Sequence, residues 1–341
     1  MKRHLLLFCS ASIALTMGLW SCADEMSQSH SDEECSSIVV ERHFGEYPVC
    51  VREIFLAGRV VDASGVERFS INGESLPLED GHWTAFQSVT AGSNEFRLEV
   101  QHKGGIVSQK VLEVVAHSAF TLPDELRDRL IVVPLIVGGS PTYRVDLFTQ
   151  AFSETLLETR MFRVVERGQL ESILLEHELH RSDLASVENA VRVGRLLLAE
   201  HVVILRVSET EDEFNAAARL VSVQSQEILW TTTFKSSSSL ATESESLGRG
   251  IALSLAMLFT IQDAVILDSS AWPEVYVDKG FLDGLSEGVK VVSLNGERPR
   301  LLGRISEVQD CVAKAVFSVT ETVFEPGQSV QVFGYMNLPK P

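Results

Sequence analysis

The chain has 341 residues, of which 22% are charged and 45% are hydrophobic, with 22 glycines and 10 prolines. This composition is typical of globular proteins and argues against disorder, collagen-like repeats and coiled coils. The 47 acidic and 29 basic residues give a formal charge of −18. Such a field repels phosphate backbones, so we expect no nucleic-acid partner. At about 100–200 residues per domain, the length predicts two or three domains.

Residues 1–21 have the organisation of an export signal peptide. Basic residues at positions 2 and 3 precede an apolar stretch from residue 5 to about residue 19, which is too short and too polar to span a bilayer comfortably. The stretch ends in the letters LWSC, which resemble the bacterial lipobox. That resemblance implies cleavage before Cys22 and lipidation of its sulfur, with palmitate among the expected acyl chains. The alternative is an ordinary secretory signal in which Cys22 is incidental.

The predicted anchor also indicates a destination. Three acyl chains, which the lipobox implies, would hold the protein firmly, whereas one chain binds membranes only marginally. Ala23 rather than Asp follows Cys22, which resembles lipoproteins of the outer membrane in Gram-negative cells. We therefore expect a protein of the periplasmic space, anchored to the outer membrane by its N-terminal lipid. Residues 22–50 are predicted to be an acidic tether, and no later segment approaches 18 uninterrupted apolar residues.

Three further cysteines remain in the predicted mature chain. Cys35 and Cys50 flank a short segment before the first domain, and an oxidising periplasm would allow them to form a disulfide. The alternative, two unpaired thiols, is left open by the sequence. Cys311 lies in a strand-like run and is expected to be a small buried residue.

Residues 51–117 are predicted to form a small β-sandwich. Short β-rich runs are separated by turn signals, among which Asn72-Gly73 and Asp80-Gly81 suit type I′ hairpin turns. The order GRVVDASGV, ING, DGHW and AGSNEFRLEV resembles bacterial immunoglobulin-like domains of cell-surface proteins. Trp83 is expected in the core of this domain, and the alternative is an exposed platform on which a sugar could stack.

Residues 128–262 are predicted to form an α/β domain. The run LIVVPLIV is continuously apolar, as in a strand that is buried on both faces of a sheet. HVVILRVSE, NAAARLVSVQ and EILWTTTFK follow as strands, with a hairpin across Ser225-Gln226. Apolar residues at helical spacing predict four helices, at residues 145–160, 169–178, 186–199 and 239–262.

This α/β segment resembles the CsgG family, which includes the curli transport lipoprotein and related periplasmic domains. The resemblance rests on a strand with a central proline (IVVPL), a helix, the run FRVVERGQLESILLEHEL from residue 162 to 179, and the strand HVVILRV. The family usually has Gly-Ala-Asp before that last strand. This chain departs from the pattern with Leu198-Ala199-Glu200-His201.

The centre of the family motif lies at a predicted strand-to-helix junction. Here a carboxylate on Glu166 would favour the helix N-terminus through the aligned backbone dipole, and Gln169 and Glu166 could also hydrogen-bond first-turn N–H groups. One interpretation of Glu166, Arg167 and Gln169 is therefore a structural cap with an exposed ion pair. The other is a contact between subunits of a homo-oligomeric ring.

Residues 263–337 return to short strands separated by glycine-rich turns. The order VYVDKGFLDGLSEGVKV, LGRISEV, AKAVFSV and GQSV resembles the small β-barrel that ends FlgT-type flagellar assembly proteins. The glycines at 280, 284 and 288 are not expected to cradle phosphate, because no helix follows them and nearby carboxylates would repel the ligand. The predicted fold class is thus multi-domain α+β, with a sandwich, an α/β domain and a small barrel.

Residues suited to catalysis are not apparent in the sequence. The cluster EHELH, residues 176–180, has histidines three positions apart, whereas the metalloprotease motif needs four. A solvated helix end is the preferred interpretation, and no metal or other cofactor is expected. No P-loop, G-x-S-x-G or C-x-x-C arrangement in the sequence is convincing as a catalytic motif. We therefore predict that the protein is not an enzyme.

The expected function is that of an assembly or scaffold lipoprotein, which contacts protein partners in the cell envelope and forms homo-oligomers. One alternative is a curli-type secretion channel. Its two extra membrane hairpins would need about 40 residues, and the α/β segment leaves none unassigned. Another alternative is an envelope module that binds glycan or peptidoglycan, for which Trp83 is the main candidate.

Overall fold

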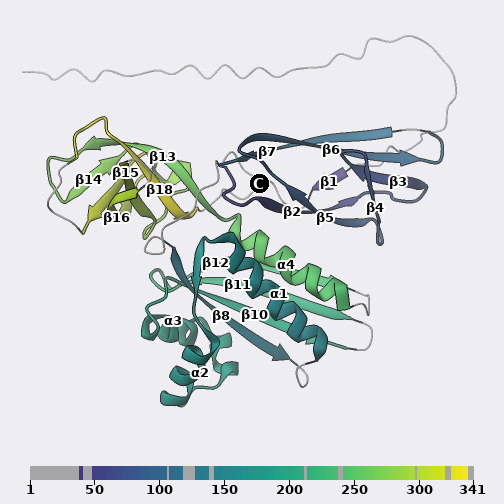
Figure 1. The fold of residues 1–341 in the computed structure, drawn as a ribbon, viewed down its shortest axis with the longest axis horizontal. Helices are drawn as coiled ribbons and strands as arrows, with labels where there is room; N and C mark the ends of the chain where they lie inside the picture. Colours follow the sequence, from purple (N-terminus) through teal and green to yellow (C-terminus); the bar gives the residue numbers. More distant parts are fainter. Residues whose placement is uncertain are drawn as a thin grey trace, which may run out of the picture. The chain divides into compact units, whose positions relative to one another are not determined.

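The computed structural model describes residues 38–40, 48–105, 107–117, 127–137, 142–210, 213–236, 241–295, 298–318 and 324–336. In these ranges the chain is mixed α+β, with most of its regular structure in strands (Figure 1). They fall within one unit, Ser36–Pro341. The signal peptide, Cys22 and Cys35 lie outside the described residues. None of the described helices is long and apolar enough to cross a membrane.

The N-terminal part consists of two β-sheets that share a core. Strands β1, β2 and β5 form one sheet, and β4, β3, β6 and β7 form the other. Their bounds are β1 Ile38–Val40, β2 Glu53–Val60, β3 Val66–Ile71, β4 Glu74–Leu76, β5 His82–Ser88, β6 Gly92–His102 and β7 Val107–Ala116. The rings of Phe69 and Trp83, one from each sheet, lie 5.0 Å apart between centroids. Two packed sheets agree with the predicted sandwich, whereas its immunoglobulin-like class stays a prediction.

Local turn chemistry explains two hairpins in this part of the chain. Asn72 and Gly73 both have positive φ, and they join β3 to β4 as the only residues between paired Ile71 and Glu74. Asp80 and Gly81 repeat the same pattern ahead of β5. Type I′ turns need positive φ at both central positions, so the sequence prediction is confirmed at both places.

Trp83 belongs to the core of the sandwich. Its side chain is only 2% exposed, and an added Cβ on Gly58 would collide with the indole ring. The expectation of a core aromatic is confirmed. The alternative, an exposed Trp83 on which a sugar stacks, is wrong because the ring has no free face.

The α/β part is a five-stranded sheet with helices on both faces (Figure 1). The strand order is β12-β11-β10-β8-β9, with β8 parallel to β9 and β10 and the other pairs antiparallel. The strands are β8 Asp128–Val137, β9 Phe162–Val164, β10 His201–Glu209, β11 Phe214–Ser222 and β12 Ile228–Ser236. The helices are α1 Tyr143–Thr159, α2 Arg167–Glu176, the 3₁₀ turn η1 Arg181–Ala185, α3 Val187–Leu196 and α4 Ala241–Ala256.

Alternation along β10 divides the core into two layers. Val203 and Leu205 pack with the residues of α1 and α4, whereas Val202 and Ile204 pack with those of α2 and α3. Successive side chains of a strand point to opposite faces, so a continuously apolar strand is what a doubly covered sheet requires. Pro134 is tolerated in β8 because β9 pairs only with residues 128–130, and among the described residues no strand pairs with that edge beside the proline.

Helix α4 is shorter than its sequence indicates. It ends at Ala256, and β13 begins at Phe259, so the predicted helix from 239 to 262 is wrong in its last turns. Phe259 pairs with Tyr335 across the first and last strands of the barrel. The strand that starts at Phe259 is stabilised by this long-range pairing with β18, although the spacing of its apolar residues favours a helix.

The C-terminal part is a closed six-stranded barrel, as the sequence predicts. Its strand order is β13-β14-β17-β16-β15-β18. The bounds are β13 Phe259–Asp268, β14 Glu274–Val277, β15 Lys290–Asn295, β16 Arg298–Val308, β17 Ala313–Phe317 and β18 Ser329–Tyr335, with a 3₁₀ turn η2 at Phe281–Asp283. Cys311 is exposed in the turn between β16 and β17, so the expectation of a buried residue is wrong at this position.

Direct contacts join the sandwich to the α/β part. On α4, Arg249 forms an ion pair with Glu53 of β2 and lies 4.8 Å over the ring of Phe86. Phe55, from β2, belongs to one buried cluster with Leu253 of α4. The sandwich therefore rests on the outer side of α4 through an apolar and ionic contact.

Candidate functional site

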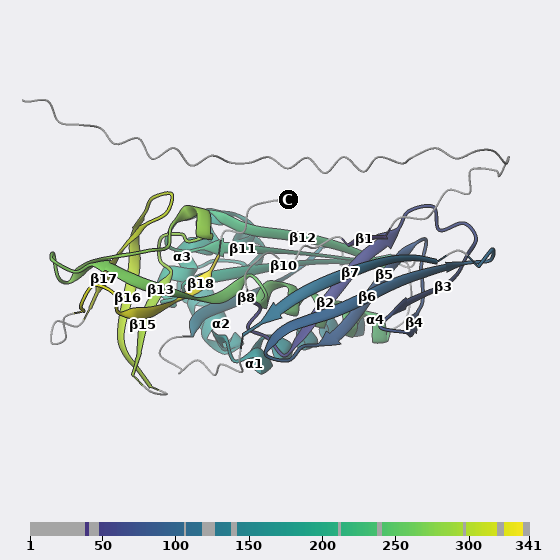
Figure 2. The same ribbon diagram turned by 90° about the horizontal axis from the view of Figure 1, so that it is seen from above.

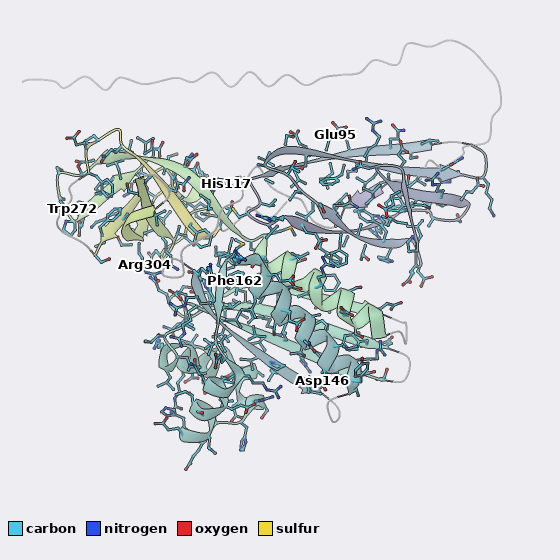
Figure 3. The ribbon with its side chains drawn as sticks, viewed as in Figure 1. Glu95, His117, Asp146, Phe162, Trp272 and Arg304 are labelled. Carbon is cyan, nitrogen blue, oxygen red and sulfur yellow. The ribbon has the colours of Figure 1, made fainter. Side chains whose placement is uncertain are left out.

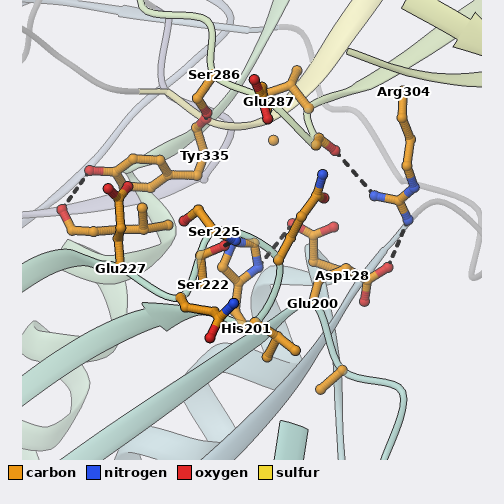
Figure 4. Close-up of a pocket in the computed structure, with 18 of the residues that line it drawn as sticks. Asp128, Glu200, His201, Ser222, Ser225, Glu227, Ser286, Glu287, Arg304 and Tyr335 are labelled. Carbon is orange, nitrogen blue, oxygen red and sulfur yellow. Dashed lines mark hydrogen bonds and ion pairs between the residues drawn. The ribbon is translucent and has the colours of Figure 1, made fainter. Parts of the chain in front are cut away.

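A cavity of about 1260 Å³ lies where the α/β sheet meets the barrel (Figure 4). From the α/β part it is lined by the end of α3, the start of β10 and the β11–β12 turn. From the barrel it is lined by residues 286–289, Arg304 and the end of β18. Charged side chains from both parts meet at its inner wall, and they form the candidate site.

The centre of the site is a buried ion pair. Lys290 begins β15 of the barrel, and its Nζ lies 2.7 Å from Oδ1 of Asp128 at the start of β8. Their side chains are 2% and 5% exposed, respectively. Glu200 lies 3.9 Å from the same ammonium group. Because an unpaired buried charge is costly, each partner requires the other, and the pair couples the two parts.

Glu200 extends the network to the surface. Its Oε1 accepts a hydrogen bond of 3.0 Å from Nη2 of Arg304, and its Oε2 accepts one of 2.7 Å from the backbone N–H of Arg129. Arg304 also donates from Nη1 to the carbonyl of Gly288 at 3.1 Å. The guanidinium is 42% exposed, so this second ion pair contributes less stability than the buried one. Figure 3 marks Arg304 on the barrel.

His201 lies beside this pair in its neutral form. Its Nδ1 is 3.6 Å from Oδ2 of Asp128, which is too long for a hydrogen bond, and its ring meets Phe259 edge-on at 5.3 Å. Burial lowers the pKa of His201 below its ordinary 6.5, although the carboxylates of Asp128 and Glu200 oppose that shift. His201 therefore fills the space between β10 and β13 as a neutral ring.

The charged groups of the site hold the barrel against the α/β sheet. The central acids, Asp128 and Glu200, form ion pairs with the cations Lys290 and Arg304. Across the described ranges, no group of three or more His, Cys, Asp and Glu side chains could hold a metal ion. The arrangement can fix the barrel to the α/β sheet.

The residues of EHELH are spread over a helix end. Helix α2 stops at Glu176, His177 is its C-cap, and Glu178 has a positive φ of 53°. His180 comes just before η1, where its backbone N–H donates to Asp183 Oδ2 at 2.8 Å. This placement agrees with the preferred interpretation of a solvated helix end.

Glu166, Arg167 and Gln169 are all exposed at the start of α2, away from the cavity lining. Glu166 is the N-cap residue but makes no side-chain capping bond, so the predicted cap is wrong in this detail. Gln169 accepts a 3.3 Å hydrogen bond from Arg129, and Arg167 pairs with Glu171 at 3.0 Å. The contact between subunits at these residues stays a prediction.

Sequence reasoning missed the buried pair of Lys290 and Asp128. A lysine within the run VKVV, where alternate residues face a core, was a usable signal for burial, because a buried ammonium group needs an anion. Which anion it meets depends on tertiary structure alone. Glu200 and His201, by contrast, stand at the departure from the family pattern, and the structure brings both to this junction.

Cys50, one member of the predicted disulfide, is half-buried beside the barrel. Its Sγ lies 3.9 Å from Oγ1 of Thr260, whose hydroxyl also donates to the carbonyl of Pro48. Burial raises the pKa of the Cys50 thiol to about 11. Even an unpaired Cys50 should therefore react slowly with alkylating reagents in the folded protein.

That burial determines how the predicted pairing of Cys35 with Cys50 must be tested. Periplasmic protein is unfolded in denaturant without reductant and treated with a maleimide. We expect Cys35 and Cys50 to stay unlabelled until reductant is added, while Cys311 is labelled throughout. Mass spectrometry of the peptides reads the result. Labelling of both residues in denaturant alone would exclude the disulfide.

Comparisons with known proteins agree with the sequence motifs. Residues 144–216 match the family model described as curli production assembly/transport component CsgG. A search of curated proteins finds no match. Among solved structures, the chain is similar to the LpoB C-terminal domain from Salmonella enterica, at 20% identity over 33% of this chain and 83% of that one, with a TM-score of 0.26.

Two further solved structures are similar over a comparable part of the chain. Lipoprotein GNA1162 from Neisseria meningitidis is 18% identical over 38% of this chain and 95% of its own, with a TM-score of 0.29. The PelC dodecamer from Paraburkholderia phytofirmans is 14% identical over 38% of this chain and 86% of its own, with a TM-score of 0.25. The match of residues 144–216 to the CsgG family model confirms the CsgG-family resemblance that the motifs indicate.

Proposed function

We propose that this protein is a non-enzymatic lipoprotein scaffold of the bacterial cell envelope, which serves the assembly of a secretion system or an appendage. The observation that carries the proposal is the attachment of the three folded parts to one another. Lys290 and Asp128 join the barrel to the α/β sheet, and Arg249 and Glu53 join the sandwich to α4. Parts held in this way present several surfaces in one fixed arrangement, which is what a scaffold needs.

The family match supports the envelope role. The matched model takes its name from curli production, assembly and transport, and these are processes of the cell surface. The lipobox-like sequence LWSC, which ends at Cys22, would provide a lipid anchor in the cell envelope. We infer that the acyl chains on Cys22 hold the protein at the outer membrane and that the body faces the periplasm.

A role without catalysis fits the cavity. Asp128 and Glu200 of its wall form ion pairs with Lys290 and Arg304 and so connect two folded parts, and a substrate that displaced these pairs would loosen the fold. Homo-oligomerisation through the exposed start of α2, at Glu166, Arg167 and Gln169, is the contact we propose for a larger assembly. Protein partners of the envelope would then bind the flanking β-domains.

The anchor is tested by replacing Cys22 with serine in the full-length chain. Without the sulfur no diacylglycerol can be attached, so Cys22→Ser should leave the precursor uncleaved or release the protein from the membrane fraction. Incorporation of labelled palmitate should fall to background. Fractionation and labelling measure both effects.

Cys9, within the signal peptide, provides a matched control for the anchor experiment. Cys9→Ser should be processed and labelled like the parent chain. Palmitate labelling that persists in the Cys22→Ser protein would reject the lipobox. Normal processing without any palmitate in the parent chain would instead indicate the ordinary secretory signal.

A further inference from the structure

The ring of His201 lies at the junction of the α/β sheet and the barrel, with little access to solvent. Its side chain is 12% exposed, and its Nδ1 is buried without a hydrogen-bond partner among the described residues. His201 begins β10 and Asp128 begins β8, and these two strands run side by side in the sheet (Figure 2). From the barrel, Phe259 meets the ring edge-on at 5.3 Å. A proton taken up by this ring would therefore be poorly hydrated unless the ring moved.

Charged groups from both parts of the junction face the ring. The α/β part supplies the carboxylates of Asp128 and Glu200, and the barrel supplies the cations of Lys290 and Arg304. The two acids form ion pairs with the two cations. The other ionisable groups that line the same cavity are Arg195, Glu227, Glu287 and Tyr335. A proton on His201 would thus add a third positive charge beside two acids that each have a cation already.

Asp128 connects the histidine to the barrel. Its Oδ1 lies 2.7 Å from Nζ of Lys290, in the barrel, and its Oδ2 lies 3.6 Å from Nδ1 of His201, in the same α/β part as Asp128. As long as the imidazole is neutral, the buried carboxylate depends on the barrel for its cation, because a buried charge without a partner is costly. A protonated imidazole would supply a cation from within the α/β part. Asp128 would then no longer need Lys290.

We propose that protonation of His201 releases the barrel from the α/β sheet, so that mild acid opens the junction. In the closed arrangement, which the structure shows, the proton adds a buried charge and is unfavourable. Once the barrel has moved away, the ring is hydrated and can pair with Asp128 in place of Lys290. The arrangement of surfaces on the chain would thereby respond to pH. The opening does not depend on the proposed scaffold function and can be measured on the chain alone.

The direction of the pH dependence follows from the burial of the ring. Burial lowers the pKa of His201 below the ordinary 6.5, and Lys290 and Arg304 act in the same direction, whereas Asp128 and Glu200 oppose the shift. In the open form, the hydrated ring binds a proton near its ordinary pKa, but in the closed form it binds one only at lower pH. The closed form is therefore fully favoured above pH 6.5 and loses this advantage as the pH falls through the interval between the two pKa values.

Hydrogen exchange of the full chain between about pH 7.5 and about pH 5 tests the proposal. The reporter is the backbone N–H of Arg129, which donates to Oε2 of Glu200 at 2.7 Å within the charged cluster. Protection factors are compared, because they remove the intrinsic effect of pH on exchange. The protection factor of Arg129 should fall by up to about tenfold per pH unit below 6.5, which is the limit for one proton. That of Leu98, in the core of the sandwich, should stay constant.

Two histidine variants separate this effect from the titration of other groups. His201→Gln keeps a polar side chain that takes up no proton, so the protection factor of Arg129 should become independent of pH over this range. His82→Gln is the matched control, because the side chain of His82 is exposed on β5. It should keep the pH dependence of the parent chain. Thermal melting at neutral pH identifies the folded variants.

A measurement on the parent chain keeps the test valid if His201→Gln does not fold. In NMR spectra, the ring of His201 can be recognised by its contact with Phe259, and it should titrate at lower pH than the exposed ring of His82. A protection factor of Arg129 that stays constant in the parent chain would overturn the proposal. So would an equal fall in the His201→Gln chain, or a His201 ring that titrates at or above the pH of His82.

Discussion

Lys290→Met is expected to lower the free energy of unfolding by about 3–5 kcal/mol, because it leaves the carboxylate of Asp128 buried without its cation. Methionine keeps most of the side-chain volume, so the loss comes from charge and not from a cavity. Urea denaturation of the purified chain, followed by circular dichroism, measures the change. The barrel is also expected to loosen from the α/β sheet, which hydrogen exchange at the start of β8 would detect.

Two further variants distinguish the loss of the buried ion pair from the loss of a lysine elsewhere on the barrel. Lys314 pairs with Glu274 on the barrel surface, where the carboxylate is 43% exposed, so Lys314→Met should cost much less stability than Lys290→Met. The double variant D128N/K290M removes both charges and should recover much of the stability that Lys290→Met loses. If Lys290→Met were no more harmful than Lys314→Met, the buried pair would not be what holds the barrel in place.

Gly248→Ala is expected to destabilise the fold by about 1–3 kcal/mol, although alanine favours an isolated helix by about 1 kcal/mol over glycine. Gly248 lies in α4 where it crosses α1. An added Cβ would overlap the carbonyl oxygen of Phe148 and lie 3.1 Å from its carbonyl carbon and 3.2 Å from the backbone nitrogen of Phe152. These atoms belong to the backbone of α1, so the two helices must separate. Thermal unfolding measures the loss.

Gly168, in the first turn of α2, is the matched control for Gly248. An added Cβ there meets no atom within 4 Å. Gly168→Ala should therefore follow helix propensity alone and stabilise the protein by up to about 1 kcal/mol. Stabilisation by alanine at both glycines would show that α1 and α4 are free to adjust, contrary to the close crossing in the structure.

Elements with local signals could be predicted from the sequence. Asn72-Gly73 forms its turn through backbone preferences of those two residues, and the apolar run of β8 requires a doubly covered sheet wherever it occurs. The end of α4 could not be predicted in this way. Phe259 continues the helical spacing, but its pairing with Tyr335 on the last strand decides its conformation. A contact between residues so far apart in the sequence cannot be predicted from the residues that surround either of them.

The candidate site was predictable only in its parts. The sequence drew attention to Glu200 and His201 because they depart from the family pattern, yet it gave no reason for the departure. In the structure, Glu200 meets Arg304 of the barrel and His201 packs against Phe259 at its first strand. Glu166, chosen for its place in the motif, lies on the surface instead. Family motifs describe the shared domain, whereas junction residues depend on what this chain adds to it.

Helix α4 has a consequence for how such a protein could arise. It packs on α1 through Gly248, touches the sandwich through Arg249, and leads into the first barrel strand after two residues, Met257 and Leu258. Modules joined by free linkers can be exchanged by recombination with little loss. A recombination breakpoint on either side of α4 would instead expose an apolar surface to solvent or leave a charged side chain without its ion-pair partner. We therefore expect the three parts to be inherited together and to change by paired substitutions across their contacts.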